Sequence, residues 1–169
     1  MIEKFSIPCA GAIIEKEINN NLYILMQERH KENKPQELGL LEIPAGKIRE
    51  NENIFDCIKR EIKEETGLNI VDVKGKENSS IYRNNGYEVI DFSPYHCTQN
   101  LIGNYPVILM VFICQTTGKL LSSSNESKNY KWISIAELKT LVEKTPEKIY
   151  PMDLALLHKF INDKSYNNL

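Results

Sequence analysis

The sequence predicts a single α/β domain in which helices pack on a sheet. Apolar runs rich in branched residues alternate with segments whose apolar residues recur at helical spacing, and no internal repeat or evident linker divides them. The 169 residues, 41% of them hydrophobic, suffice for one ordinary core and are too few for two. We therefore expect one domain over residues 1–163, followed by a polar C-terminal tail at residues 164–169.

Two apolar runs near the N-terminus predict an antiparallel hairpin over residues 7–29. They are joined by "EINNN", whose asparagines tolerate turn conformations. A polar loop, "KENKPQELG", and a short strand, "LLEIPAG", come next. Residues 51–66 then carry apolar side chains at helical spacing, and Gly67 is placed to end this helix.

The second half of the chain predicts further strands at residues 86–92 and 107–115, with "YHCTQN" between them as a loop. A polar loop, "KLLSSSNESKN", precedes "YKWIS". Ser134 and Glu137 have capping-box spacing, which predicts the start of a helix of about ten residues. Pro151 can occupy the first turn of a last helix that runs through "MDLALLHKFI".

Composition excludes several classes of partner. The net charge is −2 and charges of both signs are mixed along the chain, so neither nucleic acid nor a membrane surface is an expected partner. The N-terminus lacks the layout of a secretion signal, and the longest apolar run, residues 107–114, is too short to span a membrane. The four cysteines are dispersed without a C-x-x-C pair, which is typical of reduced thiols. We expect a cytoplasmic protein, either a monomer or a homodimer.

The helix predicted at residues 51–66 places three glutamates, Glu61, Glu64 and Glu65, within five positions. At 100° per residue, a buried stripe is formed by four apolar residues: Ile54, Phe55, Ile58 and Ile62. Glu61 and Glu65 fall at the margin of this stripe, whereas the lysines of the helix fall on the solvent side. Carboxylates at such a margin are partly desolvated and need partners.

Two interpretations of the cluster are open from the helix pattern alone. Like charges at helical spacing cost about 0.2–0.5 kcal/mol per pair, so stability by itself does not favour the arrangement. A divalent cation such as Mg²⁺ would reverse the repulsion, because hard ions take oxygen ligands. Alternatively, the segment is an ordinary charged helix whose glutamates are balanced by Arg60 and the neighbouring lysines.

The residues around the cluster resemble the Nudix box. In "GKIRENENIFDCIKREIKEETGL", the glycines, the glutamates and the arginine stand at every defined position of that motif. The "QER" that ends the first hairpin, the lead-in "LEIPAGK" and the late "YKWISIAEL" are similar to further segments of Nudix hydrolases. The resemblance implies a Nudix-type α/β/α sandwich with a mixed β-sheet. It also implies hydrolysis of the diphosphate linkage in a nucleoside diphosphate joined to another group, with Mg²⁺ or Mn²⁺ as cofactor.

The same resemblance assigns metal ligands and a general base. It implies that Glu61, Glu64 and Glu65 bind the metal ion, and that Glu64 or a loop carboxylate takes a proton from the attacking water. The division of labour among the glutamates is open. The main-chain carbonyl of Ala45 is a further candidate ligand, because Gly46 permits a tight backbone path; the alternative is an ordinary glycine between a strand and a loop.

Three basic residues are also expected to take part in the site. Arg60 is expected to orient a catalytic glutamate and to pair with Glu52, the alternative being a surface salt bridge. Arg29 and Lys47, with Glu28 beside them, lie where they can meet the phosphates of a small-molecule nucleotide substrate. The alternative for these three is that they are ordinary surface residues at strand ends.

A further catalytic carboxylate from outside the box is commonly recruited in this family from a loop before the late strand. Glu126, six residues before Trp132, is the candidate. Asp91 and Glu88 compete for the same role. Glu126 can equally be a solvated loop residue.

The lead-in "LEIPAGK" is the form common in ADP-ribose pyrophosphatases and related nucleoside-diphosphate-sugar hydrolases, whereas nucleotide-pool enzymes more often have Pro-Gly-Gly there. Two features depart from the former group. No proline stands about sixteen residues beyond the box, and the first hairpin begins almost at Met1. We expect an ADP-ribose-like substrate, with nucleoside triphosphates second. A non-catalytic nucleotide-sensing module is a third interpretation, which the retained Arg60 and three glutamates disfavour.

Overall fold

A computed structural model describes residues 3–30 and 35–166. At its centre lies a sheet in which β1 (Ile7–Ile18) runs between β2 (Asn21–Arg29) and β9 (Val107–Thr117). β10 (Ser127–Ser134) extends the sheet beyond β2, and β5 (Asn69–Val73) extends it beyond β9. β1 and β9 are parallel, while their other neighbours are antiparallel, so the sheet is mixed as predicted.

Three short strands complete the eight-stranded sheet. β3 (Leu41–Glu42) pairs with β2, β4 (Ala45–Lys47) pairs with β1, and β8 (His96–Gln99) pairs with β9. The predicted single strand "LLEIPAG" is therefore two strands that pair with different neighbours. The predicted polar loop before it falls partly on residues 31–34, which lie outside the described residues, and its continuation forms the 3₁₀ turn η1 (Pro35–Glu37).

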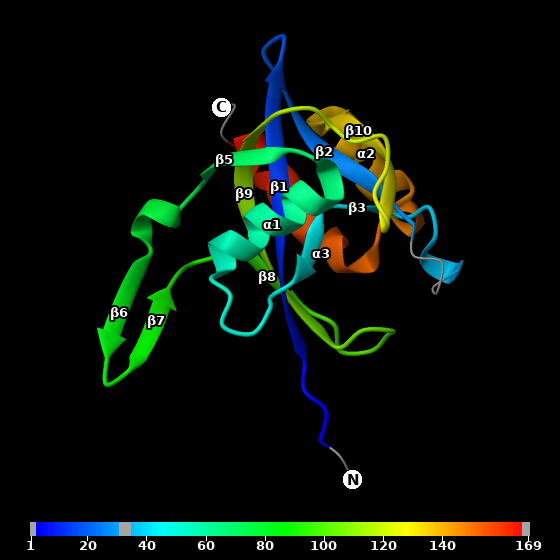
Figure 1. The fold of residues 1–169 in the computed structure, drawn as a ribbon. Helices are drawn as coiled ribbons and strands as arrows, with labels where there is room; N and C mark the ends of the chain where they lie inside the picture. Colours follow the sequence, from blue (N-terminus) through cyan, green and yellow to red (C-terminus); the bar gives the residue numbers. More distant parts are fainter. Residues whose placement is uncertain (1–2, 31–34, 167–169) are drawn as a thin grey trace.

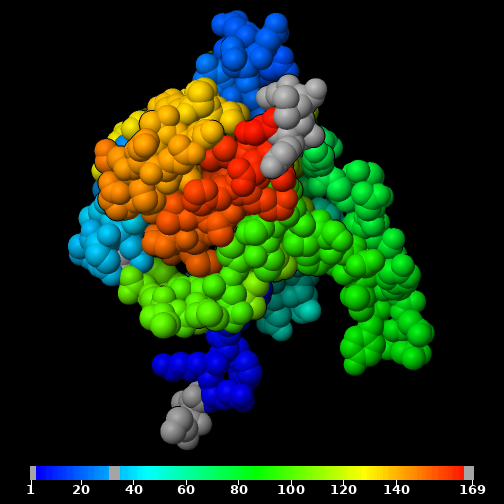
Figure 2. Space-filling view, turned by 180° about the vertical axis from the view of Figure 1, so that it is seen from behind, coloured from blue at the N-terminus to red at the C-terminus, as the bar shows by residue number. Residues whose placement is uncertain are grey.

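Helices cover both faces of the sheet, which gives the α/β/α sandwich. Figure 1 shows α1 (Ile54–Thr66) in front of the sheet, with α2 (Ile135–Lys144) and α3 (Pro151–Tyr166) behind it. The same two helices form the orange and red surface in the view from behind (Figure 2). The sheet has a hydrophobic core on each face, and successive residues of β1 point into opposite cores. Ile13 belongs to the core under α2 and α3, and Ile14 belongs to the core under α1.

The register predicted for α1 is confirmed. All four residues of the predicted stripe are buried, while both lysines of the helix are exposed. The helix begins three residues later than predicted, at Ile54, because the side chain of Asn53 accepts a hydrogen bond from the N–H of Phe55 and caps the helix. It ends at Gly67, whose φ of 80° is the left-handed conformation that glycine adopts readily.

The first hairpin and the two later helices also agree with their sequence signals. Asn19 and Asn20 form the turn with φ values of 49° and 60°. The hydroxyl of Ser134 accepts the N–H of Glu137 at 3.2 Å and caps α2. α3 begins at Pro151 as expected, but it continues to Tyr166, so the start of the predicted polar tail is helical. Residues 167–169 lie outside the described residues.

The prediction of a loop for "YHCTQN" is wrong, because four of its residues form β8 along the apolar strand β9. β5 and β6 (Ser80–Asn84) are further strands that the sequence did not predict. β6 pairs with β7 (Tyr87–Asp91), which was predicted. These two strands form a separate hairpin that projects from the body of the protein (Figures 1 and 2). No helix of the described residues has the length and apolar character needed to cross a bilayer.

Gly67 offers a test of how tightly the end of α1 is packed. A β-carbon at Gly67 would lie 2.8 Å from Cγ of Leu121 and 3.0 Å from the carbonyl oxygen of Lys119. Gly75 has a similar φ of 86° but nothing within 4 Å of its built β-carbon. We predict that Gly75→Ala lowers the free energy of unfolding by about 1–2 kcal/mol through backbone strain alone. Gly67→Ala should lower it by at least about 1 kcal/mol more, because the clash adds to the strain.

Urea unfolding of the two variants and the wild type, monitored by circular dichroism, measures this difference. Equal losses for the two variants would show that Leu121 and the neighbouring backbone move aside freely. The pair is matched in that both positions have a left-handed backbone, whereas the space around the built β-carbon differs.

Candidate active site

The site is built on a close approach of α1 to β4. A β-carbon built on Gly46 would overlap the carboxylate of Glu61, at Cδ and at both oxygens. Since no side chain fits there, the carboxylate of Glu61 occupies the space that glycine leaves open. Gly46 has no left-handed φ, so the predicted reason for this glycine, an unusual backbone path, is replaced by a requirement for space.

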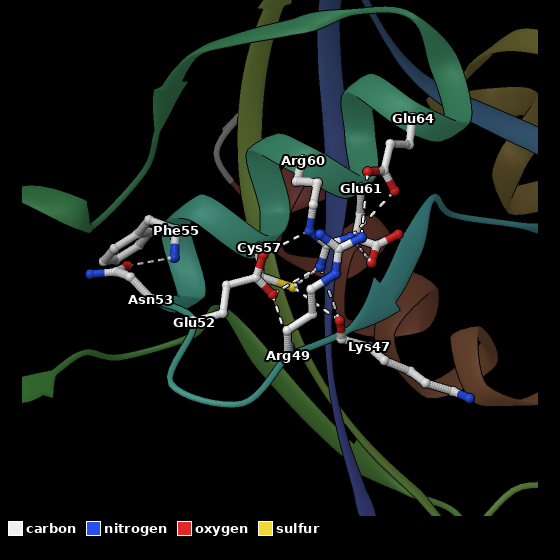
Figure 3. Close-up of polar contacts among 9 residues, drawn as sticks. All are labelled: Lys47, Arg49, Glu52, Asn53, Phe55, Cys57, Arg60, Glu61 and Glu64. Carbon is white, nitrogen blue, oxygen red and sulfur yellow. Dashed lines mark hydrogen bonds and ion pairs between the residues drawn. The ribbon is translucent and has the colours of Figure 1, made fainter.

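Arg60 holds the carboxylates of α1 in place (Figure 3). Its Nε and Nη2 donate to Oε1 and Oε2 of Glu52 at 2.7 and 2.8 Å, a bidentate pair, as the sequence predicted. Nη1 donates to Oε1 of Glu61 and lies 3.3 Å from Oε2 of Glu64. Nη2 also reaches the main-chain carbonyl of Lys47 at 3.2 Å. These hydrogen bonds raise the pKa of Arg60 and lower the pKa of Glu52 to about 2.

Glu64 lies on the outer side of the helix. Its side chain is 54% exposed, and Oε1 is 3.7 Å from Nη2 of Arg49. Arg49 was not singled out from the sequence. Its N–H also donates to Oε2 of Glu52 at 2.9 Å, which fixes the loop that leads into α1.

Glu65 is the buried member of the cluster, with 7% of its surface exposed. Its Oε2 accepts a hydrogen bond from Nε2 of Gln27 at 2.8 Å and from the N–H of Ala45 at 3.2 Å. The hydroxyl of Tyr130 donates to the main-chain carbonyl of the same glutamate. The structure therefore links Ala45 to the acidic cluster through its N–H, whereas the sequence-based prediction chose its carbonyl.

The acidic cluster has the right chemistry for Mg²⁺ or Mn²⁺, because carboxylate oxygens are the ligands such ions prefer. Among residues 3–30 and 35–166, however, no three His, Cys, Asp or Glu side chains are grouped closely enough to hold a metal ion. Glu61 and Glu64 face Arg60, and Glu65 faces Gln27. Bringing the three carboxylates to one ion therefore requires the exposed side chain of Glu64 to rotate, during which the bidentate bond to Glu52 can keep Arg60 in place.

A cavity of about 690 Å³ opens beside the cluster, within the usual size range of ligand sites. Part of its wall comes from the segment around Gly46 and from Glu61. Lys47 lines it as well, and Figure 3 shows its amino group pointing away from the Arg60 network. The remaining wall is contributed by later and earlier segments, among them Arg29, Tyr105, Glu126, Tyr150 and Asp153.

Arg29 is not the surface residue that the alternative interpretation suggested. It is buried, and it donates to Glu37 at 2.7 Å and to Glu42 at 2.6 Å. Its guanidinium also lies 4.3 Å from the ring centre of Tyr150 and 5.9 Å from that of Tyr105. The charge of Arg29 is therefore balanced within the protein, and the residue lines the cavity as part of an ionic and aromatic network.

The other predicted polar residues of β2 and of the loops are distributed differently. Glu28 accepts hydrogen bonds from Asn129 at 2.7 Å and Lys131 at 3.1 Å on the neighbouring strand β10. Of the three candidates for an additional carboxylate, Glu126 lines the cavity. Glu88 and Asp91 lie on the projecting hairpin, where Glu88 pairs with Arg83 at 2.6 Å. The geometry thus favours Glu126 over its competitors.

Asp153 is a cavity residue that the sequence did not single out. It is 1% exposed, and its Oδ2 accepts the N–H of Ile43 at 2.9 Å. Burial raises the pKa of its carboxyl to about 8, which favours the protonated form of this side chain. The signal available in the sequence was an acidic residue inside the apolar run "MDLALL", which is also the ordinary composition of a helix N-terminus.

Known proteins resemble this chain in sequence and in fold. A family model of the NUDIX domain matches residues 7–153. An 8-oxo-dGTP diphosphatase of Buchnera aphidicola subsp. Schizaphis graminum (strain Sg) is 31% identical over 136 residues, which cover 80% of this chain and 82% of that protein.

Solved structures show the same fold. The MutT protein from Methanosarcina mazei Go1 has a TM-score of 0.60 and 21% identity, over 97% of this chain and 99% of that one. The NUDIX domain of Shewanella oneidensis NrtR, solved with ADP ribose, has a TM-score of 0.60 and 13% identity, over 95% of this chain and 90% of that one. On the strength of the family model and the curated relative, this chain belongs to the Nudix family and is a hydrolase of phosphoric anhydride bonds.

Proposed function

We propose that this protein is a Mg²⁺-dependent pyrophosphohydrolase, also served by Mn²⁺, whose substrate is a purine nucleoside triphosphate. The observation that carries the proposal is the carboxylate of Glu61 on the cavity wall, in the space left by Gly46 and bonded to an arginine that Glu52 fixes. Carboxylates and a guanidinium are the charged groups that metal-assisted hydrolysis of a diphosphate uses, which supports the proposal. The cysteines among the described residues are all free thiols, which supports a cytoplasmic location.

The residues of the site have distinct roles in this reaction. Glu61, Glu64 and Glu65 would hold the cation, which when bound offsets the charge of the diphosphate and lowers the pKa of water. Arg60 orients Glu61 and keeps its position through Glu52. Glu126, on the cavity wall, or Glu64 accepts the proton of the attacking water.

The remainder of the cavity suits a nucleoside. In its protonated form, which burial favours, Asp153 can donate one hydrogen bond and accept another, which matches the mixed donor and acceptor edge of a purine base. Tyr105 and Tyr150 also line the cavity and provide aromatic surface for a base. The curated relative at 31% identity is named an 8-oxo-dGTP diphosphatase, which also supports a purine nucleoside triphosphate.

ADP-ribose is the second candidate. It is supported by the lead-in "LEIPAGK" at the site itself and by the similarity in fold to a NUDIX domain solved with ADP ribose. Both candidates contain the diphosphate linkage and a purine base. They differ in the group attached beyond the second phosphate, so a direct comparison of turnover separates them.

The first test measures turnover of purine nucleoside triphosphates, including 8-oxo-dGTP, against ADP-ribose and diadenosine polyphosphates, with 5 mM MgCl₂ as an assay condition. We expect magnesium-dependent release of pyrophosphate and a nucleoside monophosphate, with the largest kcat/KM for a triphosphate. Glu64→Gln and Glu65→Gln should each lower kcat by a factor of about 100 or more, because each removes a charged metal ligand. Binding of ADP-ribose without cleavage of any of these compounds would refute the proposal.

Gly46→Ala provides a second test, since the added methyl group displaces the carboxylate of Glu61. We predict a loss of turnover of about 100-fold, the usual effect of moving a catalytic group by about 1 Å. Gly75→Ala is the control, because it changes a glycine outside the cavity. Circular dichroism verifies that both variants are folded. Wild-type turnover in folded Gly46→Ala would show that the position of Glu61 is not critical.

Asp153→Asn tests the neutral carboxyl. With a pKa of about 8 in the folded protein and about 4 in the unfolded chain, Asp153 retains its proton on folding between these pH values, so the folded state binds more protons than the unfolded state. The wild type should therefore lose stability as pH rises from about 4 to 8, by up to about 1.4 kcal/mol per unit, relative to the variant. The variant keeps an oxygen for the N–H of Ile43 and cannot ionise.

Urea unfolding of both proteins at pH 5, 6, 7 and 8 measures this. The variant's advantage should grow with pH and level off above about 8. A difference that is constant over this range would show that Asp153 titrates in the folded protein as it does in the unfolded chain.

A further inference from the structure

Gln27 is a polar residue at a position where the strand would otherwise be apolar. It lies on β2, two residues after Leu25, and like Leu25 it is completely buried. Residues two apart on a strand share a face, and Leu25 belongs to the core under α1. The side chain of Gln27 is therefore directed toward α1, where Nε2 reaches Oε2 of Glu65 at 2.8 Å.

Two donors converge on this one carboxylate oxygen. The N–H of Ala45 on β4 donates to the same Oε2 at 3.2 Å. Because the donors come from two different strands, they fix Glu65 relative to the sheet as well as to its own helix. Both donors are electrically neutral, whereas the donor that holds Glu61 is a charged guanidinium.

The contact is made at a cost to stability. Oε1 of Gln27 is buried and has no hydrogen-bond partner among the described residues. A buried acceptor left unpaired costs about 1–3 kcal/mol, which a leucine or methionine at the same position would avoid. Exchanging the amide oxygen and nitrogen by a flip of the side chain would not satisfy Oε1, because this acceptor would then face the carboxylate oxygen of Glu65. A stabilising role alone does not account for a glutamine here.

We propose that Gln27 is a positioning residue that holds Glu65 in the orientation needed to bind the divalent cation. The inference rests on the proposed function in that the cation is the one used in that reaction. Residues that orient a metal ligand from behind typically change metal affinity by about 10–100-fold when they are removed. Gln27 stands outside the Nudix box and comes to Glu65 only through the pairing of distant segments.

The competing explanation is that Gln27 merely ties β2 to α1. Tyr130 supplies a matched control, because its hydroxyl ties β10 to the same glutamate by a hydrogen bond to the main-chain carbonyl. If the tie alone mattered, Gln27→Leu and Tyr130→Phe would behave alike. If the orientation of the carboxylate matters, only the substitution of Gln27 should affect the cation.

The experiment titrates Mn²⁺ into the intact, metal-free protein without substrate and counts unbound Mn²⁺ by electron paramagnetic resonance. We expect Gln27→Leu to weaken Mn²⁺ binding by about 10–100-fold. Tyr130→Phe should stay within about two-fold of the wild type. Gln27→Met, which keeps an unbranched side chain of similar length, replaces Gln27→Leu if that variant fails to fold. Unchanged affinity in the Gln27 variant, equal weakening in both variants, or a wild type that binds no Mn²⁺ would each overturn the proposal.

Nucleotide hydrolysis by the same proteins separates this inference from the proposed function. In Gln27→Leu, higher Mg²⁺ should restore kcat toward the wild-type value, since the ligand is displaced and not lost. A wild type that cleaves no nucleotide but shows the Gln27-dependent difference in Mn²⁺ affinity would refute the proposed function and leave the role of Gln27 standing. A wild type that cleaves nucleotides, with a Gln27 variant of unchanged Mn²⁺ affinity, would refute the role of Gln27 alone.

Discussion

The approach of α1 to β4 is the constraint on which the site depends. The helix cannot move outward, because Ile58 and Ile62 are buried against the sheet on its inner side. β4 cannot move either, because it is paired with the central strand β1. The carboxylate of Glu61 is therefore confined to the gap at Gly46, where it faces the cavity. Packing of an ordinary hydrophobic core thus places a charged group at the cavity wall.

The glutamates of the cluster are held by two different kinds of hydrogen-bond donor. Arg60 places a positive charge beside Glu61 and Glu64. Its bidentate bond to Glu52 does not involve these two side chains, so it can hold the guanidinium in place when they move. Glu65, the most buried of the three, accepts hydrogen bonds from two electrically neutral donors. The charged-helix and metal-site interpretations of the sequence were therefore not exclusive, since Arg60 supports a cluster that remains suited to a cation.

Features set by neighbouring residues were predictable from the sequence, and features set by distant contacts were not. The register of α1, its end at Gly67 and the cap at Ser134 result from local spacing, and the structure confirms them. β8 is a short, polar strand that exists because β9 is beside it, which its own residues do not reveal. The neutral carboxyl of Asp153 depends likewise on burial by segments far away in the chain, so no local pattern could predict it.

β2 connects the two parts of the cavity mechanically. Gln27 on this strand bonds the cluster on α1, and Arg29, two residues later, bonds Glu42 and the aromatic wall. Two residues along a strand span about 6.6–6.8 Å and share one face, so this spacing is fixed by backbone geometry and not by side-chain choice. This part of β2 pairs with β3 on one side and with β10 on the other, so neighbouring strands hold it in the sheet. In the proposed function, β2 would therefore fix the spacing between the groups that meet the diphosphate and those that meet the nucleoside.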